Sequence, residues 1–383
     1  MTVLCAGFPL SGLMTVLLGV LLPFLARLYH LDDAQAGMFF ALQFLAATAA
    51  SAAYGWTAGR WPAARVVAVS YAWMAAGTAC FLVGGLQAAR TGVALYGLGL
   101  GWNIASVNLV AAQFSHGTAV RALNLLNMFW GAGAVAGPAL AAWALQTRPL
   151  RVVMMALSLI LLAAAAGSLR LWNTPSLVGS HGSAPPAAGS SRFPWATFLF
   201  LFLYVGTENC ISGWVPTLGN RLLGAAATLS ALGQSAFWLA ILLGRGLLAA
   251  RAVRRAHGWM LAGLLLAATG TGLLLRAQTA ASFLLGAALA GLGLAPQFPT
   301  AVALYQQRAG AAAATWLGML LAGGGLGGAV LPPLVGVLAD HTGGLPRASS
   351  TVLVVMAAMG VLLLWERRRA AGSPDGTLVH GRN

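Results

Sequence analysis

Glu208 is the residue whose type and place in the sequence most clearly predict chemistry. It lies midway along an apolar stretch at about 195–218, whereas the other five of the six acidic residues fall in predicted loops, helix ends or the C-terminal tail. An ionised carboxylate at the centre of a membrane costs at least ~2–3 kcal/mol. We therefore expect Glu208 to bind a substrate, to carry a proton, or to do both. The structural alternative is a neutral glutamic acid that ties two helices together.

Polar neighbours of Glu208 predict a small binding surface on the same helix. Tyr204 and Ser212 lie four residues before and after it, so the three side chains share one helical face. Asn209 is the next residue along the chain. These hydroxyl, amide and carboxyl groups suit hydrogen bonds to a small polar solute.

Amides and tryptophans in other apolar stretches extend this predicted site. A neutral sugar needs amide or carboxylate groups for its hydroxyls and aromatic faces for its C–H surfaces. For each amide, the alternative role is a hydrogen bond between helices, worth ~0.6–2 kcal/mol. The expected substrate-binding residues are Glu208, Asn209, Gln43, Asn103, Asn127, Trp130, Gln297 and Trp238, and further polar groups at membrane depth are Asn108, Asn124 and Gln234.

The arginines constrain the substrate. All 21 basic residues are arginine, and none is expected at the middle of an apolar stretch. Arg245 comes nearest, toward the inner end of the stretch at about 226–249. A carrier of phosphate, nitrate or dicarboxylates would be expected to place a cation at its binding site. The sequence therefore favours a neutral or weakly cationic substrate.

The composition predicts that these residues lie on membrane-spanning helices. Of the 383 residues, 59% are hydrophobic and 7% are charged, against roughly 25% charged in a soluble domain. About 20 apolar residues cross the hydrocarbon layer, and a helix satisfies its own backbone groups there. Twelve stretches meet this length, at about 3–26, 36–56, 65–87, 92–113, 122–145, 150–169, 195–218, 226–249, 258–276, 280–304, 313–338 and 347–365.

A polar segment divides these helices into two groups of six. Residues 170–194 have the Pro-, Ser- and Gly-rich composition of a linker. The halves also repeat at a constant offset of 194, which aligns GLGLGWNIASVNLVAAQ (97–113) with GLGLAPQFPTAVALYQQ (291–307). Two such repeats with substrate between them near the midplane are typical of secondary transporters. We predict an N-terminal six-helix bundle at 1–169, a cytoplasmic linker at 170–194, a C-terminal six-helix bundle at 195–366 and a cytoplasmic tail at 367–383.

The distribution of arginine predicts the orientation. With the N-terminus in the cytoplasm, the inner loops and tail carry fourteen arginines and the outer loops carry seven, as the positive-inside rule requires. The arginines form no single basic stripe, so we expect lipid headgroups rather than nucleic acid to meet this charge. Abundant Ala, Gly and Arg without Lys indicate a high-GC bacterial gene. We therefore predict a multi-pass protein of the bacterial inner membrane, with both termini cytoplasmic.

Four stretches carry a resemblance to a known family. They are GVLLPFL (19–25), RALNLLNMFWGAGAVAGP (121–138), YVGTENCISGWVPT (204–217) and GLGLAPQFPT (291–300). Through them the chain resembles the major facilitator superfamily and, within it, the fucose–galactose–glucose:proton symporter group, the relatives of L-fucose permease. The resemblance implies a twelve-helix fold of two six-helix bundles, alternating access, and proton-coupled symport of a monosaccharide.

Two departures from the family pattern limit what can be carried over. Gly59 stands where the loop between the second and third helices of the superfamily usually has an aspartate. The first and fourth predicted helices contain no acidic residue, although L-fucose permease uses acids on both for coupling. Proton coupling through Glu208 is therefore a separate hypothesis, motivated by its depth and isolation.

Two other functions compete with sugar transport. Proton-driven efflux of lipophilic or cationic compounds would suit the same fold, with one membrane acid among many Met and Trp residues. A membrane enzyme would need a nucleophile with a base, or a metal cluster, and the apolar stretches contain neither His nor Asp. We expect no catalytic residue, no metal and no cofactor. The expected partners are a small-molecule substrate, a proton or alternatively sodium as coupling ion, and the lipid bilayer, with the protein a monomer.

Overall fold

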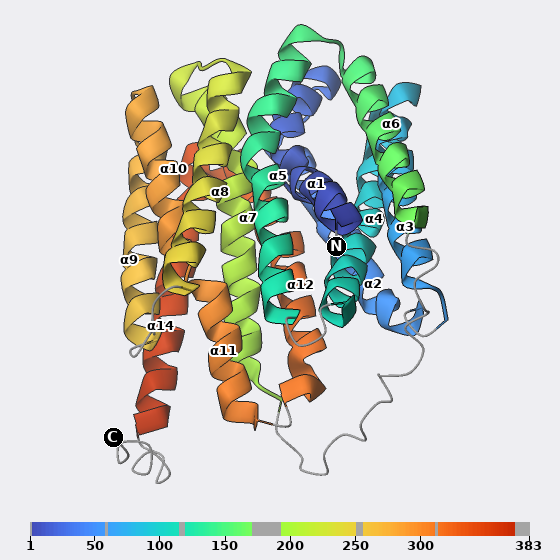
Figure 1. Ribbon diagram of the computed structural model, residues 1–383. Coiled ribbons are helices and arrows are strands. Elements are labelled where there is room, and N and C mark those ends of the chain that lie inside the picture. The colour runs from blue at the N-terminus through green and yellow to red at the C-terminus, as the bar shows by residue number, and fades with distance from the viewer. Residues whose placement is uncertain are drawn as a thin grey trace.

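The computed structural model describes residues 2–57, 60–114, 119–170, 193–249, 256–310 and 313–371, and every regular element within these ranges is a helix (Figure 1). Most of the predicted linker at 170–194, the end of the predicted tail and Gly59 lie outside the described residues. The helices of the first half are α1 (Thr2–Tyr29), α2 (Asp33–Thr57), α3 (Ala63–Val83), α4 (Leu86–Phe114), α5 (Ala119–Thr147) and α6 (Leu150–Ser168). Those of the second half are α7 (Trp195–Leu223), α8 (Ala227–Ala249), α9 (Ala256–Leu275), α10 (Ala280–Leu294), α11 (Gln297–Ala309), α12 (Ala313–Thr342), α13 (Leu345–Ser349) and α14 (Thr351–Ala371).

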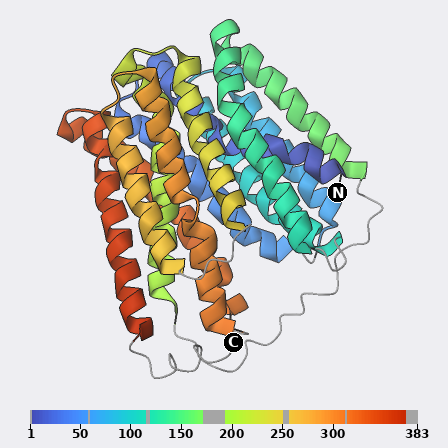
Figure 2. The same ribbon diagram turned by 60° about the vertical axis from the view of Figure 1, so that its left-hand side comes forward.

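These helices confirm the predicted all-α architecture with twelve membrane spans. Among the described residues, eleven helical spans are long and apolar enough to cross a membrane, with α10 and α11 counted as one and α13 and α14 as another. The twelfth is α4, which is not among these eleven but has 29 residues, enough to cross a membrane. Figures 1 and 2 both show α9 and α14 on the side of the molecule away from α6.

The tenth predicted span, at about 280–304, consists of two helices, because α10 ends at Leu294 and α11 begins at Gln297. Together they form one membrane span, Ala280–Ala309. Proline has no N–H to donate, and its ring clashes with the carbonyl four residues earlier. Pro296, the residue that precedes α11, therefore interrupts the helix within this span. By contrast Pro138, Pro216 and Pro332 lie inside continuous helices.

Glycines pack the helices closely, and their contacts confirm the repeat between the halves. A Cβ added to Gly97 of α4 would come 2.6 Å from the carbonyl oxygen of Gln43 on α2. A Cβ added to Gly291 of α10 would overlap the carbonyl oxygen of Phe237 on α8. Both residues of the second pair lie 194 positions after those of the first. The sequence repeat is therefore a repeat of helix contacts, in which small residues let backbones approach.

The two halves meet through α2 with α12, α5 with α8, and α1 with α7. At one end of the molecule an ion pair joins Asp33 of α2 to Arg221 of α7, and we call this the tight end. A Cβ added to Gly37 would come 2.9 Å from the Cα of Pro333 on α12, so the backbones of the two halves nearly touch there. The opposite end, where α6 ends and α7 begins, is called the linker end. Among the described residues, α4 and α11 make no extensive contact with the opposite half.

Candidate functional site

Glu208 lies near the midpoint of α7 and is buried, with 8% of its surface exposed. The Tyr204 hydroxyl donates a 2.7 Å hydrogen bond to Glu208 Oε1. Arg245 of α8 contributes Nη2, which lies 3.3 Å from the same oxygen and 3.2 Å from the Tyr204 hydroxyl. We call these three residues the Glu208 cluster. It places one acid, one guanidinium and one phenol at the centre of the second half.

The sequence predicted only part of this cluster. The four-residue spacing of Tyr204 and Glu208 placed them on one face of a helix, and the hydrogen bond between them confirms it. The expected isolation of Glu208 is wrong, because Arg245 reaches it from the end of α8. Helical side chains slant toward the N-terminus of their own helix. A long arginine near the C-terminal end of α8 therefore reaches back toward the middle of the span.

Arg245 retains unused hydrogen-bonding capacity. A guanidinium carries five N–H donors, and the contacts of Arg245 with Glu208 and Tyr204 both come from Nη2. Its Nε is buried and has no hydrogen-bond partner among the described residues. The side chain is 35% exposed, whereas that of Glu208 is 11% exposed. Arg245 can therefore bind a further polar ligand while it keeps a contact with Glu208 or Tyr204.

Two predicted aromatic residues lie between the halves near this cluster. Trp130 of α5 and Trp238 of α8 meet edge to face, with ring centroids 5.3 Å apart. Trp238 lies seven residues before Arg245, which is about two turns and ~10 Å along the same face of α8. Its indole Nε1 is buried without a hydrogen-bond partner in the described part of the chain. Asn127, one turn before Trp130, is exposed.

Two of the predicted amides in the first half make hydrogen bonds between helices. Gln43 donates to the carbonyl oxygen of Thr15 at 3.1 Å and accepts a 2.9 Å hydrogen bond from the Tyr96 hydroxyl. Asn103 accepts a 2.6 Å hydrogen bond from the Ser11 hydroxyl. It also donates to the Ser70 hydroxyl at 2.8 Å. In this arrangement both side chains are engaged with neighbouring helices, and their role in substrate binding stays a prediction.

The predicted amides of the second half donate to backbone carbonyl oxygens. Gln297 is fully buried and donates to the carbonyl oxygens of Met260 and Gly293 at 2.9 and 3.1 Å. Asn209 donates to the carbonyl oxygen of Val205 in its own helix at 2.8 Å. Gln234 of α8 donates across the halves to the carbonyl oxygen of Val16 on α1 at 3.0 Å. The structure thus brings together Glu208 and its two partners, while these three amides bond to backbone carbonyl oxygens.

Comparison with known families identifies the fold. The sequence model of the family described as the Major Facilitator Superfamily matches residues 4–257, which is more than half of the chain. This protein belongs to the major facilitator superfamily. The match shows a multi-pass membrane protein of a transporter superfamily, and the sugar-symporter subgroup stays a prediction. A search of curated protein sequences finds no match for this member of the superfamily.

Solved structures of transporters share the same fold. A mutant of the peptide transporter POT has 13% sequence identity and a TM-score of 0.79, over 96% of this chain and 94% of that one. A POT family transporter in complex with a thioalcohol-conjugated peptide has 13% identity and a TM-score of 0.77, over 97% and 96%. A bacterial homologue of the human lysosomal transporter Spinster, in an inward-facing and occupied conformation, has 14% identity and a TM-score of 0.73, over 96% of each chain. At sequence identities of 13–14%, the similarity to these structures shows a shared fold and nothing about the substrate.

Proposed function

We propose that this protein is a secondary active transporter that moves a small solute of zero net charge, most simply a monosaccharide, by alternating access. The observation that carries this proposal is the Glu208 cluster, a carboxylate and a guanidinium 3.3 Å apart at the centre of a membrane bundle. The pair has no net charge. Its oxygens and N–H groups can accept from and donate to the hydroxyls of a sugar, and Trp130 and Trp238 offer aromatic surface.

The same contact supports the proposal of coupling to protons. Arg245 is held to Glu208 through Nη2 at 3.3 Å. Protonation of the carboxylate removes the charge that attracts the guanidinium. The freed N–H groups of Arg245 then become available to the substrate. Proton binding and substrate binding would thus be linked through one side chain, as transport against a gradient requires.

A second candidate substrate is a zwitterion such as an amino acid or a short peptide. It is favoured by the buried, unpartnered Nε of Arg245, because a guanidinium binds a carboxylate through two parallel N–H groups. Glu208 would then face the ammonium group. The same arginine argues against the efflux of lipophilic cations, since it adds a positive charge beside the only acid of the cluster.

Proton coupling is tested by transport in proteoliposomes. With Glu208→Gln, we expect uptake driven by a pH gradient to be lost while exchange of labelled for unlabelled substrate continues. The matched control is Glu366→Gln, which removes the acid of another arginine pair in the second half and should leave both activities intact. Unchanged pH-driven uptake by Glu208→Gln would contradict the proposal.

Substrate class is tested by thermal unfolding of the purified protein with hexoses, amino acids, a dipeptide, 5-aminolevulinic acid and lipophilic cations. A ligand at 100 times its dissociation constant stabilises the folded protein by about 2.7 kcal/mol. A shift with a hexose that persists in Glu208→Gln, as continued exchange requires, and disappears in Arg245→Gln supports a sugar carrier. A shift with a zwitterion that disappears in Arg245→Gln supports the second candidate, and a shift with cations alone overturns both.

A further inference from the structure

A groove lined by aromatic and arginine side chains opens at the linker end of the second half, away from the Glu208 cluster. It is a cavity of about 580 Å³ formed by the start of α7, the end of α11, the start of α12 and the end of α14. The groove includes Phe193, Trp195, Trp316, Trp365, Arg308 and Arg369. We call it the aromatic–arginine groove.

Aromatic rings form one wall of this groove. The Phe193 ring lies 4.4 Å from that of Trp195 and 5.3 Å from that of Trp316, measured between centroids. Trp195 is 70% exposed and Trp365 is 44% exposed. Exposed tryptophans at the ends of membrane helices are typical of the level of the lipid headgroups. This wall can cover the glycerol and the upper part of an acyl chain.

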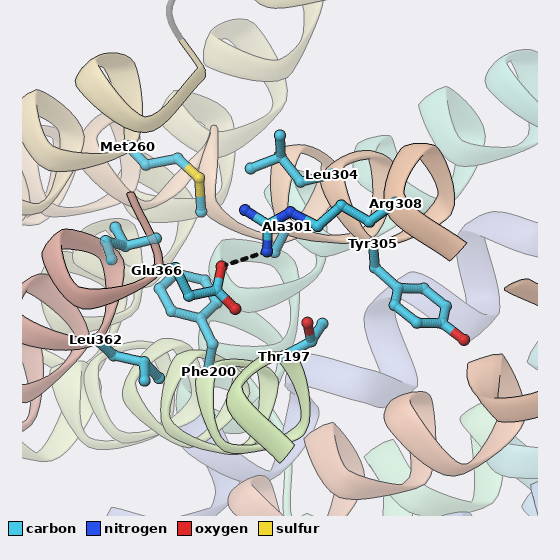
Figure 3. A pocket seen from close by; sticks show the side chains of 10 residues that line it. Thr197, Phe200, Met260, Ala301, Leu304, Tyr305, Arg308, Leu362 and Glu366 are labelled. Atoms are coloured by element: carbon cyan, nitrogen blue, oxygen red, sulfur yellow. Dashed lines mark hydrogen bonds and ion pairs between the residues drawn. The ribbon is translucent and has the colours of Figure 1, made fainter. Parts of the chain in front are cut away.

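Two arginines complete the lining of the groove. The guanidinium of Arg369 lies over the ring of Trp365, with its Cζ 4.2 Å from the ring centroid. Arg308 contacts Glu366 through Nη1 at 2.9 Å (Figure 3). Its side chain is nevertheless 42% exposed. Its Nη2 lies 3.3 Å from His257 Nε2.

The groove carries an excess of positive charge. Arg308 and Arg369 line it together with one acid, Glu366. Arg367 and Arg368 are exposed at the same end of α14, so the charge of this end of the molecule attracts an anion. Each arginine near a membrane surface contributes about 1 kcal/mol to the attraction of anionic lipid. A soluble anion would gain the charge but would leave the aromatic wall uncovered.

We propose that the aromatic–arginine groove binds an anionic phospholipid, with the phosphate on Arg369 and the exposed side of Arg308 and the glycerol and acyl chain against Trp195 and Trp365. The groove would bind this lipid whichever substrate the protein transports. The ligand comes from the membrane itself and is recognised by its negative charge and its apolar tail.

The test measures lipid binding to the purified full-length protein in neutral detergent. Phosphatidylglycerol and phosphatidylcholine are added in turn, and bound lipid is quantified by native mass spectrometry while unfolding is followed by heating. We expect phosphatidylglycerol to bind more tightly than phosphatidylcholine and to raise the melting temperature. Arg369→Gln should weaken phosphatidylglycerol binding about fivefold.

A matched control removes the same charge elsewhere. Arg347 of α13 is exposed at the tight end, and Arg347→Gln should leave phosphatidylglycerol binding unchanged. Equal weakening by both variants would mean that the lipid responds to net charge, and would overturn the site. Stabilisation by glycerol 1-phosphate as strong as that by phosphatidylglycerol would assign the groove to a soluble anion instead. Melting without lipid shows whether each variant folds.

A second variant, Trp365→Leu, should weaken binding of the lipid while keeping the charge.

Discussion

Two ion pairs of this transporter differ in geometry and in what they join. Asp33 and Arg221 lie 188 residues apart and connect the two halves at the tight end through two contacts of 2.6 and 2.7 Å. Glu208 and Arg245 lie within the second half and meet through one contact of 3.3 Å. The first pair is a bidentate fork, which is the strong form of an arginine–carboxylate contact. The second leaves donors of its arginine unused.

The difference between the two ion pairs indicates that one contact must break during transport and that the other can exchange its partner. Alternating access requires the halves to separate at one end while they close at the other. The Asp33–Arg221 pair holds the tight end shut, so it has to break whenever that end opens. The Glu208–Arg245 pair joins neighbouring helices of one half and can survive that motion. Its contacts can change when substrate or a proton arrives.

The largest effect is expected when the Glu208–Arg245 pair is broken from one side. Arg245→Gln leaves the carboxylate of Glu208 buried with only Tyr204 as a partner in the described residues. We expect a loss of ~1–3 kcal/mol in unfolding free energy. This is less than the ~3–5 kcal/mol for a fully buried pair, because Arg245 is partly exposed. Substrate affinity should fall at least ~30-fold.

A double variant separates stability from function. In Arg245→Gln with Glu208→Gln no charge stays buried, so most of the lost stability should return while transport stays absent. Thermal melts and proteoliposome uptake measure the two quantities. Arg308→Gln, which removes an arginine from an exposed pair, should cost less than about 1 kcal/mol and leave transport intact. If the double variant regained transport, the Glu208–Arg245 pair would have only a structural role.

A smaller effect is expected when the tight end is loosened. Asp33→Asn removes the charge that holds Arg221, whose side chain is 41% exposed. A contact of ~1 kcal/mol changes the population of the opened end about fivefold. Cys210 is buried on the face of α7 where Gly206 meets α12 and Gly213 meets Phe40 of α2. Its labelling by a thiol reagent added at the tight end therefore reports separation of the halves. We expect about fivefold faster labelling, in a background where Cys5 and Cys80 are Ser.

Reversal of both charges provides the control. Asp33→Arg together with Arg221→Asp keeps an ion pair across the halves, so the labelling rate of Cys210 should return toward that of the parent protein. Equal labelling rates in the parent and in Asp33→Asn would show that this pair does not hold the tight end closed.

The fold of this protein could be predicted because a membrane imposes simple rules on sequence. A helix must be about 20 apolar residues long to cross it, and this spacing located all twelve spans. The repeat of glycines located the close contacts of α4 with α2 and of α10 with α8. The sequence shows which spans contain proline but not which proline ends a helix, since Pro296 separates α10 from α11 while Pro138, Pro216 and Pro332 lie within helices that continue through them.

The candidate site was predicted less completely. The pairing of Glu208 with Tyr204 depends on the local period of one helix, which the sequence contains. The contact of Glu208 with Arg245 depends on the packing of α7 on α8 and on the direction of a long side chain. The contact of Asp33 with Arg221 depends on how two halves dock. Neither of these two contacts produces a periodic pattern in the sequence. The engagement of Gln43 and Asn103 by neighbouring hydroxyls likewise follows from tertiary packing.

The smallest effect is expected from Asp340, which strengthens the tight end without belonging to its ion pair. Its carboxylate on α12 accepts hydrogen bonds from the backbone N–H groups of Asp33 at 3.3 Å and Ala34 at 3.1 Å, at the start of α2. Carboxylates stabilise helix N-termini by about 0.5–1 kcal/mol. Asp340→Asn keeps an acceptor but removes the charge, so labelling of Cys210 should accelerate by about twofold. In combination with Asp33→Asn the effects should exceed their sum, because both carboxylates act on one end of α2. An unchanged labelling rate in Asp340→Asn would show that Asp340 only caps the helix and takes no part in closing the halves.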